Sequence, residues 1–256
     1  MDTHLKTDPG APSGFYEAEA AGLAWLATAP GGARTVTVVE VAPGRIVLER
    51  IVPARPSPAA AHAFGGALAR THAAGAHAFG ARPAGWDGPL FIGSREMPTT
   101  AADSWGAFYA EARVLPFLAP ALAAGYLHDG EARIVRDACD LIASGAFDDP
   151  APPARIHGDL WSGNVLWSPD GVVLIDPAAH GGHPETDLAM LALFGLPFLD
   201  DAVAGYAEAA PLRAGWRSRV PVHQLHPLAV HAAGHGRAYG AALADAARAT
   251  LALRDA

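Results

Sequence analysis

Cysteine and basic charge are both scarce in this sequence. Its 256 residues include one cysteine, Cys139, which has no second cysteine to pair with and is expected to be a small core residue. Lysine and arginine total 18 against 26 aspartates and glutamates, the formal net charge is −8, and no basic run of five residues occurs. This balance argues against a protein that coats nucleic acid or an anionic membrane, so neither is expected as a partner.

Long hydrophobic runs are also lacking. The apolar stretch 188–199 is interrupted by Gly195 and Pro197 and is too short to span a bilayer. Residues 1–10 hold charged residues and proline where a secretory signal would have an apolar core. These features predict a cytoplasmic protein. Hydrophobic residues still make up 51% of the chain, which predicts one large domain, or a small lobe beside a larger one, with a sizeable core.

The first part of the chain has a mixed α and β pattern. The segment 15–28 predicts a helix, and the β-rich runs 35–40 and 45–51, joined by an Ala-Pro-Gly turn, predict a hairpin. A proline-rich break at 54–58 predicts a linker. We therefore expect an N-terminal, nucleotide-binding lobe over 1–53 and a catalytic and substrate-binding lobe over 54–256.

The rest of the chain is mostly helical. Helices are predicted over 59–76, 103–124 and 128–144, and from residue 185 to the C-terminus apart from a proline-marked break at 211–221. In between, 155–157 reads as a short extended piece. The runs 164–167 and 172–175 flank Ser-Pro-Asp-Gly, which is typical of a tight β-hairpin. The fold class predicted is α+β.

The segment from Ile156 to Asn164, with Asp176 after the next strand, carries the chemistry. Phosphoryl transfer to a hydroxyl requires an acidic residue that orients the acceptor and receives its proton, and oxygen ligands that hold Mg²⁺ against the phosphates. Asp159 and Asn164 are five residues apart, as are the base and the amide of a kinase catalytic loop. The alternative is that Asp159 caps a turn, Asn164 starts a strand and Asp176 precedes a proline turn.

The loop His-Gly-Asp-Leu-Trp-Ser-Gly-Asn at 157–164 resembles the catalytic loop of the fructosamine kinase family, in the aminoglycoside-phosphotransferase-like branch of the protein-kinase-like fold. The His-Gly-Asp and Asn elements are shared with related phosphotransferases, whereas Trp-Ser-Gly at 161–163 points more narrowly to fructosamine kinases. The resemblance spans nearly the whole chain from Lys6 onward. It continues through the segments 175–178, 182–190, 194–195, 211–212, 215–216, 224–228 and 230–231.

The resemblance implies roles for residues outside the loop. Lys6 would grip the α- and β-phosphates of ATP, with Glu19 as its helix partner and Glu17 as an alternative. The backbone of Glu49, Arg50 and Ile51 would bind adenine. Asp187 resembles the carboxylate that braces the catalytic loop, although an exposed acid at a helix start is the alternative interpretation.

Three further residues near the loop are candidates. His157 is expected to be a buried, hydrogen-bonded loop anchor. Trp161 would form a flat wall for a sugar ring, with a structural tryptophan as the alternative, and His231 would face the acceptor pocket. The metal ligands expected are Asn164 and Asp176, for Mg²⁺, while the other histidines do not form a convincing zinc pattern.

The chain departs from the family pattern in two places. Only five residues precede Lys6, where kinase-like folds place two strands and a phosphate-covering loop, so the N-terminal lobe is expected to be truncated. Met97 and Thr99 stand where the family segment usually has Gln and Asn, which leaves the acceptor open.

The resemblance implies an ATP-dependent kinase that phosphorylates a sugar hydroxyl of a fructosamine- or ribulosamine-type ketoamine, small or protein-bound, in deglycation repair. Two alternatives remain at this point. One is a phosphotransferase for another small alcohol, such as an aminoglycoside or an amino alcohol. The other is a degenerate kinase-like binding module. The sequence does not indicate an oligomeric state.

Overall fold

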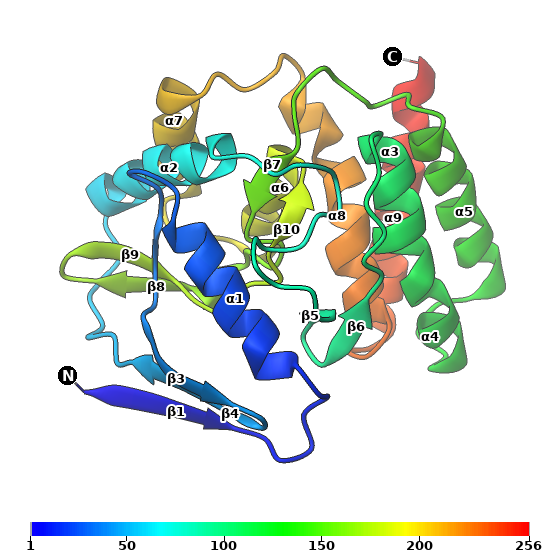
Figure 1. Ribbon diagram of the computed structural model, residues 1–256. Helices are drawn as coiled ribbons and strands as arrows, with labels where there is room; N and C mark the ends of the chain where they lie inside the picture. Colours follow the sequence, from blue (N-terminus) through cyan, green and yellow to red (C-terminus); the bar gives the residue numbers. More distant parts are fainter. Residues whose placement is uncertain (1, 256) are drawn as a thin grey trace.

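The computed structural model, which describes residues 2–255, combines a small antiparallel sheet with a larger, mainly helical part (Figure 1). No helix within these residues is long and apolar enough to cross a membrane. The helices are α1 (Phe15–Ala27), α2 (Pro58–Ala73), α3 (Trp105–Phe108), α4 (Leu118–Ala123), α5 (Asp129–Ala143), α6 (Pro184–Phe194), α7 (Leu199–Ala209), α8 (Trp216–Ala232) and α9 (Arg237–Ala252). The strands are β1 (Thr3–Thr7), β2 (Arg34–Thr35), β3 (Val38–Ala42), β4 (Arg45–Glu49), β5 (Leu90–Ile92), β6 (Arg95–Met97), β7 (Ala154–Ile156), β8 (Val165–Ser168), β9 (Gly171–Leu174) and β10 (His180–Gly182). The predicted α+β class, with a small sheet lobe and a helical lobe, is confirmed.

The N-terminal sheet presents one face to α1. Strand β4 lies between β1 and β3, both antiparallel to it. Ile46 and Leu48 of β4 are buried and pack with Tyr16 and Leu23 of α1, as expected of a strand with one face against a core. Lys6 of β1 is directly opposite Ile46 in the register, so its side chain leaves the sheet on the same face, towards α1.

The predicted strand 35–40 is wrong as a single element. Arg34–Thr35 forms β2, which runs parallel to β9, whereas β3 begins only at Val38. The N–H of Val36 donates to the carbonyl of Leu174 at 2.9 Å, and the Val36 side chain is buried beside Val173. The chain therefore changes sheets here, because burial of Val36 holds this segment against the second hairpin.

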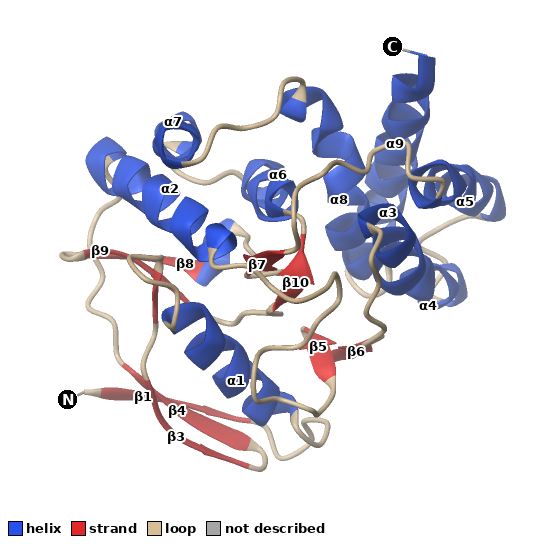
Figure 2. Cartoon of the chain, turned by 45° about the horizontal axis from the view of Figure 1, so that its top comes forward, coloured by secondary structure: helices blue, strands red, loops and turns tan. Residues whose placement is uncertain are grey.

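The hairpin predicted around the Ser-Pro-Asp-Gly turn is confirmed. Strands β8 and β9 are antiparallel, with Ser168 paired to Gly171 across the turn, and β7 pairs with β10. Strand β7 ends just before the loop 157–164 and strand β9 ends just before Asp176, so the two strands bring the loop and Asp176 together. Figure 2 shows α1 lying between the N-terminal sheet and these strands, with α3–α9 beyond them. A lobe boundary between residues 53 and 54 remains a prediction.

Helices α2 and α7 approach each other closely because each has a glycine at the contact. A Cβ at Gly65 would lie 1.8 Å from the carbonyl oxygen of Ala202, and one at Gly205 would lie 2.0 Å from that of His62. Any larger residue would push the helices apart. Their close packing brings His72, near the end of α2, next to Tyr206 of α7.

The predicted helix 103–124 is broken rather than continuous. A π-helical turn over 109–114 and a short 3₁₀ turn separate α3 from α4. Pro116 lacks the N–H that would bond the carbonyl of Ala112 in an α-helix. Arg113 Nη1 donates to that carbonyl at 3.0 Å, and His226 Nδ1 donates to the carbonyl of Arg113 at 2.6 Å. Side chains thus satisfy carbonyl groups that a regular helix would have used.

The predicted break at 211–221 is too long. Helix α8 begins at Trp216 and contains both Pro221 and Pro227. Each proline removes one helical hydrogen bond, but tertiary packing offsets the loss because α8 is buried around most of its circumference from Val222 onward. Its buried apolar residues include Val222, Leu225, Leu228 and Ala229.

Candidate active site

The loop 157–164 is anchored by a buried carboxylate. Asp187, in the first turn of α6, accepts hydrogen bonds from the backbone N–H groups of His157, at 2.8 Å, and Gly158, at 3.0 Å. Its Oδ2 also lies 3.1 Å from Nε2 of His72, whose Nδ1 bonds the hydroxyl of Tyr206 at 2.9 Å. Burial alone would raise the pKa of Asp187, but the hydrogen bond and charge of His72 and the contacts with His157 outweigh it and lower that pKa. Asp187 therefore lies where a loop brace is expected and is not an exposed acid.

His157 is buried and uses both ring nitrogens within the loop. Its Nε2 donates to the carbonyl of Ile175 at 2.9 Å, while its Nδ1 accepts from the N–H of Asp159 at 3.3 Å. Burial lowers the pKa of His157, which keeps the ring neutral and suits this donor–acceptor arrangement. The ring ties the loop to the end of the hairpin, in the position predicted for an anchor.

Gly158 is required by the path of the loop. Its φ of 80° lies in the left-handed region, and a Cβ there would come within 2.3 Å of the carbonyl oxygen of Ala178. This close approach turns the chain so that the next residue, Asp159, faces the cleft.

Asp159 and Asn164 contact each other across the loop. Asn164 Nδ2 donates to the backbone carbonyl of Asp159 at 2.8 Å and to its carboxylate Oδ2 at 3.2 Å. Burial raises the pKa of Asp159 to about 7, an effect that Asn164 opposes and that the charges of Asp176 and Asp187 reinforce. Asp159 is thus a carboxyl group whose proton affinity is raised, as suits a group that receives a proton.

Lys6 and Asp176 join the two parts of the molecule. Lys6 Nζ lies 2.8 Å from Glu19 Oε2 and 2.7 Å from Asp176 Oδ1. Burial would lower the pKa of Lys6, but the attraction of Glu19 and Asp176 outweighs it and raises that pKa. The structure pairs Lys6 with Glu19 rather than with Glu17. Asp176 has a φ of 54°, in the left-handed region. This conformation is strained for residues other than glycine, and such residues are concentrated at functional sites.

Three cavities meet at these residues. One of about 210 Å³ is lined by Lys6 and Glu19 together with Asp159, Asn164, Trp161 and Asp176. A second, of about 370 Å³, shares Lys6 and Asp176 and extends along the predicted adenine-binding segment. A third, of about 380 Å³, shares Asp159 and Trp161 and includes His231. This arrangement provides adjoining spaces on the two sides of Asp159 and Asp176.

The segment predicted to bind adenine, 49–51, lines the second cavity. Glu49 and Arg50 already donate their backbone N–H groups, to Thr37 at 2.9 Å and to Asp2 at 2.8 Å. Ile51 is half-buried and lines the same cavity. Apolar side chains from both sheets complete the walls, namely Val36, Leu48, Leu166 and Ile175. Of the three predicted residues, Ile51 is therefore the one whose N–H is best placed to remain available.

Trp161 and His231, the two residues predicted to contact the acceptor, both line the third cavity. The Trp161 side chain is 40% exposed and lines the first and third cavities, and its ring packs edge-on against Phe194 at 6.0 Å. His231 is half-buried, its ring centroid lies 4.9 Å from that of Phe194, and its Nδ1 bonds the carbonyl of Pro227 at 2.7 Å. An exposed tryptophan face at a cavity is available to a ligand, whereas a purely structural tryptophan would be covered.

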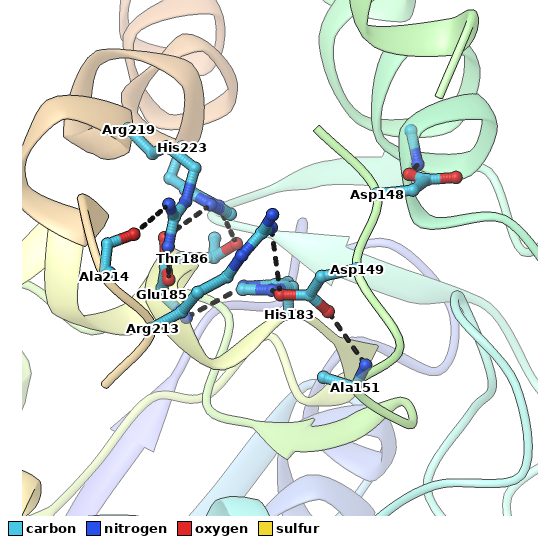
Figure 3. A network of polar contacts seen from close by, with 11 residues as sticks. Asp148, Asp149, Ala151, His183, Glu185, Thr186, Arg213, Ala214, Arg219 and His223 are labelled. Atoms are coloured by element: carbon cyan, nitrogen blue, oxygen red, sulfur yellow. Dashed lines mark hydrogen bonds and ion pairs between the residues drawn. The ribbon is translucent and has the colours of Figure 1, made fainter. Parts of the chain in front are cut away.

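A buried polar network lies behind the loop and fixes the start of α6 (Figure 3). His183 caps α6 by accepting from the N–H of Glu185 at 3.1 Å, and its Nε2 donates to Asp149 at 3.3 Å. Glu185 binds Arg219 and lies 3.4 Å from His223 Nε2. Burial would raise the pKa of Glu185, but His223 and Arg219 outweigh it and lower it to about 2.

Three side chains of this network have the residue types and the spacing of a metal-ligand set. Donor atoms of His183, Glu185 and His223 all lie within 4.8 Å of one another. Each of them, however, already has a protein partner, since His223 Nδ1 also bonds the hydroxyl of Thr186 at 3.0 Å. The group therefore serves as a support for α6, and with it for Asp187.

Sequence reasoning missed His72 and Tyr206, which orient Asp187, and Arg95 and His235, which line the third cavity. One signal was present for His72. It follows Phe64 and Leu68 at intervals of four residues on the buried face of α2, and a histidine on such a face needs a hydrogen-bond partner. No comparable signal marks the other three.

Comparison with known proteins agrees with this geometry. The family model described as "Fructosamine kinase" matches residues 2–252. A proposed ketoamine kinase from Enterococcus faecium is 28% identical over 92% of this chain and 83% of its own length. Alignments with several other curated ketoamine kinases span about half the length of those proteins.

Solved structures of related proteins agree with the family match. A Thermobifida fusca protein with the proposed name fructosamine-3-kinase has 47% sequence identity and a TM-score of 0.90, with 98% of this chain and 85% of the other covered. A thermostable mutant of an aminoglycoside phosphotransferase, at 15% identity, has a TM-score of 0.63 over 98% of this chain and 87% of its own, which shows the kinase-like fold alone. The chain belongs to the fructosamine kinase family.

Proposed function

We propose that this protein transfers the γ-phosphoryl group of Mg-ATP to a hydroxyl on the sugar part of a ketoamine. One observation carries the proposal. Asp159 lies on the wall shared by two cavities, one reaching Lys6 and Asp176 and the other reaching His231. A nucleotide on the first side and an alcohol on the second would meet at this carboxylate. The family relatives named as ketoamine kinases supply the acceptor class.

Asp159 acts on the acceptor in this proposal. Its carboxylate accepts the hydroxyl hydrogen, which orients the oxygen towards the γ-phosphorus. As the new oxygen–phosphorus bond forms and the bond to ADP breaks, the proton passes to Asp159. The raised pKa of this carboxyl group favours that transfer at neutral pH. Asn164 holds the carboxylate in place through its amide N–H.

Asp176 and Asn164 would hold Mg²⁺. A carboxylate and an amide on the wall of one cavity are the oxygen donors that this ion prefers, and Asn164 uses its nitrogen towards Asp159, which leaves its oxygen as the donor. When bound, Mg²⁺ would neutralise charge on the phosphates. Lys6, steadied by Glu19, adds a second positive charge beside them.

The adenine would lie in the cavity beside 49–51, with Ile51 donating its backbone N–H and the apolar residues of both sheets stacking on the ring. On the other side, Trp161 would support the sugar ring, and His231 would line the far wall. Phosphorylating the sugar part would destabilise the adduct, which gives the reaction a role in deglycation.

An acceptor panel tests this function. Purified protein is incubated with Mg-ATP and, separately, with fructosamine and ribulosamine adducts of lysine, an amino alcohol and an aminoglycoside, and products are identified by mass spectrometry. A phosphorylated ketoamine, formed with release of ADP, is the expected result. Phosphorylation of the amino alcohol or the aminoglycoside without any ketoamine product would refute the proposed acceptor class.

A further inference from the structure

The third cavity has an uneven distribution of charge. Among the described residues that line it, Asp159 is the one acid, whereas Arg95, His231 and His235 are basic. Burial lowers the pKa of His231, so that ring is neutral at physiological pH. Arg95 therefore provides the permanent positive charge in the space that would receive the acceptor.

The Arg95 guanidinium is held at one edge of the cavity. Arg95 begins β6 and pairs with Ile92 across a tight turn, and its Nη2 donates to the carbonyl of Ala233, just after α8, at 2.7 Å. A Cβ at Gly234 would come within 3.0 Å of Nη2, so the glycine leaves room for the guanidinium. The hairpin β5–β6 lies beside the end of α8 in Figure 1.

This contact uses only part of the hydrogen-bonding capacity of the side chain. A guanidinium has five N–H groups in a rigid plane, and no carboxylate among the described residues forms an ion pair with Arg95. A half-buried, anchored guanidinium with free N–H groups is suited to a planar anion such as a carboxylate.

The position of Arg95 indicates which part of the acceptor would carry the anion. Asp159 must face the hydroxyl that is phosphorylated, so an acceptor that fills the cavity directs its other groups towards Arg95 and the histidines. In a ketoamine, those other groups are the remaining sugar hydroxyls and the amine part, and of these only the amine part can carry a carboxylate. A neutral amide at this point would leave the positive charge of Arg95 unmatched.

We propose that Arg95 binds a carboxylate on the amine part of the acceptor, so that the enzyme selects ketoamines formed on free amino acids. This inference rests on the proposed function and narrows it. It assigns Arg95 as a residue that determines specificity and gives it no part in proton transfer.

A matched pair of acceptors tests the inference. The fructosamine adducts of glycine and of glycinamide differ only in whether the carboxylate is free, and kcat/KM is measured for both. The wild-type protein is expected to favour the glycine adduct about tenfold, mainly through KM, as a charge-assisted hydrogen bond provides. Arg95→Gln retains a donor for the carbonyl of Ala233 and removes the charge, so it is expected to lower kcat/KM about tenfold more for the glycine adduct than for the glycinamide adduct.

Arg82→Gln is the matched control. Arg82 also bonds a backbone carbonyl, that of Gly88 at 2.9 Å, but it lines a different cavity. It is expected to leave the preference unchanged. Equal losses on both adducts in Arg95→Gln would show that Arg95 does not bind the carboxylate and would overturn the inference, as would a wild-type enzyme without preference. If neither adduct is phosphorylated while the lysine adducts are, the inference falls and the proposed function stands. If no ketoamine is phosphorylated, the proposed function fails and the inference falls with it.

Discussion

The ammonium group of Lys6 is held between two carboxylates that come from opposite parts of the fold, Glu19 of α1 at 2.8 Å and Asp176 after β9 at 2.7 Å. Lys6 itself lies on β1, which among the described residues pairs with β4 at the edge of its sheet. The two ion pairs therefore fix the end of the side chain beyond what the pairing of its strand provides. They also connect the N-terminal sheet to the residue that we propose as a metal ligand.

Glu19→Gln is expected to weaken ATP binding because it removes one of these two restraints on Lys6. We expect a loss of about five- to tenfold in affinity, the range of a charge-assisted hydrogen bond at a partly exposed site. Glu17→Gln is the control, since Glu17 lies on the same helix and does not contact Lys6. Isothermal titration with ATP measures both, and equal affinities in the two variants would contradict the assignment of Glu19.

Asp159→Asn is expected to keep the fold and to lower phosphoryl transfer by about 10²–10⁴-fold, the usual effect of removing a positioned base. The asparagine fills the same space and still lies beside Asn164, but it cannot receive the proton. Asp170→Asn, in the exposed turn of the second hairpin, should have wild-type turnover. Steady-state kinetics on a verified acceptor provide the comparison. A fully active Asp159→Asn variant would remove this residue from its proposed role.

Asp176→Asn is expected to reduce the Mg²⁺-dependent part of the ATP affinity more than Asn164→Ala does. The reason is that a carboxylate neutralises metal charge and an amide does not. Asparagine is chosen at position 176 because it tolerates the left-handed backbone there, at φ 54°. ATP titrations with and without Mg²⁺ give the metal-dependent part of the affinity. A metal dependence in Asp176→Asn equal to that of the wild type would refute the ligand assignment.

The parts of the site that could be predicted from sequence are those whose partners are close along the chain. One loop and the hairpin after it contain Asp159, Asn164 and Asp176, so the spacing of these residues along the chain predicts that they lie close together. His72 and Tyr206 reach Asp187 only through the packing of α2 against α7, which no local pattern encodes. The division of the run 35–40 had a similar cause, since its first residues join β9, far along the sequence.

Acid should weaken the fold through Glu185. Its pKa is about 2 in the folded protein and near 4.5 when unfolded, so the folded state favours the ionised form. The resulting stability, on the order of 3 kcal/mol, is present above pH 4.5 and is lost as the pH falls towards 2.

Glu185→Gln tests this pH dependence. The variant should be less stable at neutral pH, because Arg219 loses its buried partner, and its free energy of unfolding should fall less steeply between pH 4.5 and 2. Urea unfolding at several pH values measures both effects. Glu208→Gln, at an exposed pair with His62, should follow the wild-type curve. Parallel curves for Glu185→Gln and the wild type would show that Glu185 does not carry the acid sensitivity.

Gly158→Ala should separate the shape of the catalytic loop from the stability of the fold. Gly158 has a φ of 80°, and its missing Cβ would lie 2.3 Å from the carbonyl oxygen of Ala178. Gly85 has a φ of 82° with nothing within 4 Å of such a Cβ, so Gly85→Ala has the same backbone strain without the clash. Both variants should lose about 1–2 kcal/mol of stability from that strain. Only Gly158→Ala must also move the loop, which displaces the neighbouring Asp159 and should lower kcat by about 10²-fold, as small misplacements of reacting groups do.

Thermal unfolding and turnover, measured on both variants, test the comparison. Equal turnover in the two variants would mean that the loop accommodates the methyl group without moving Asp159.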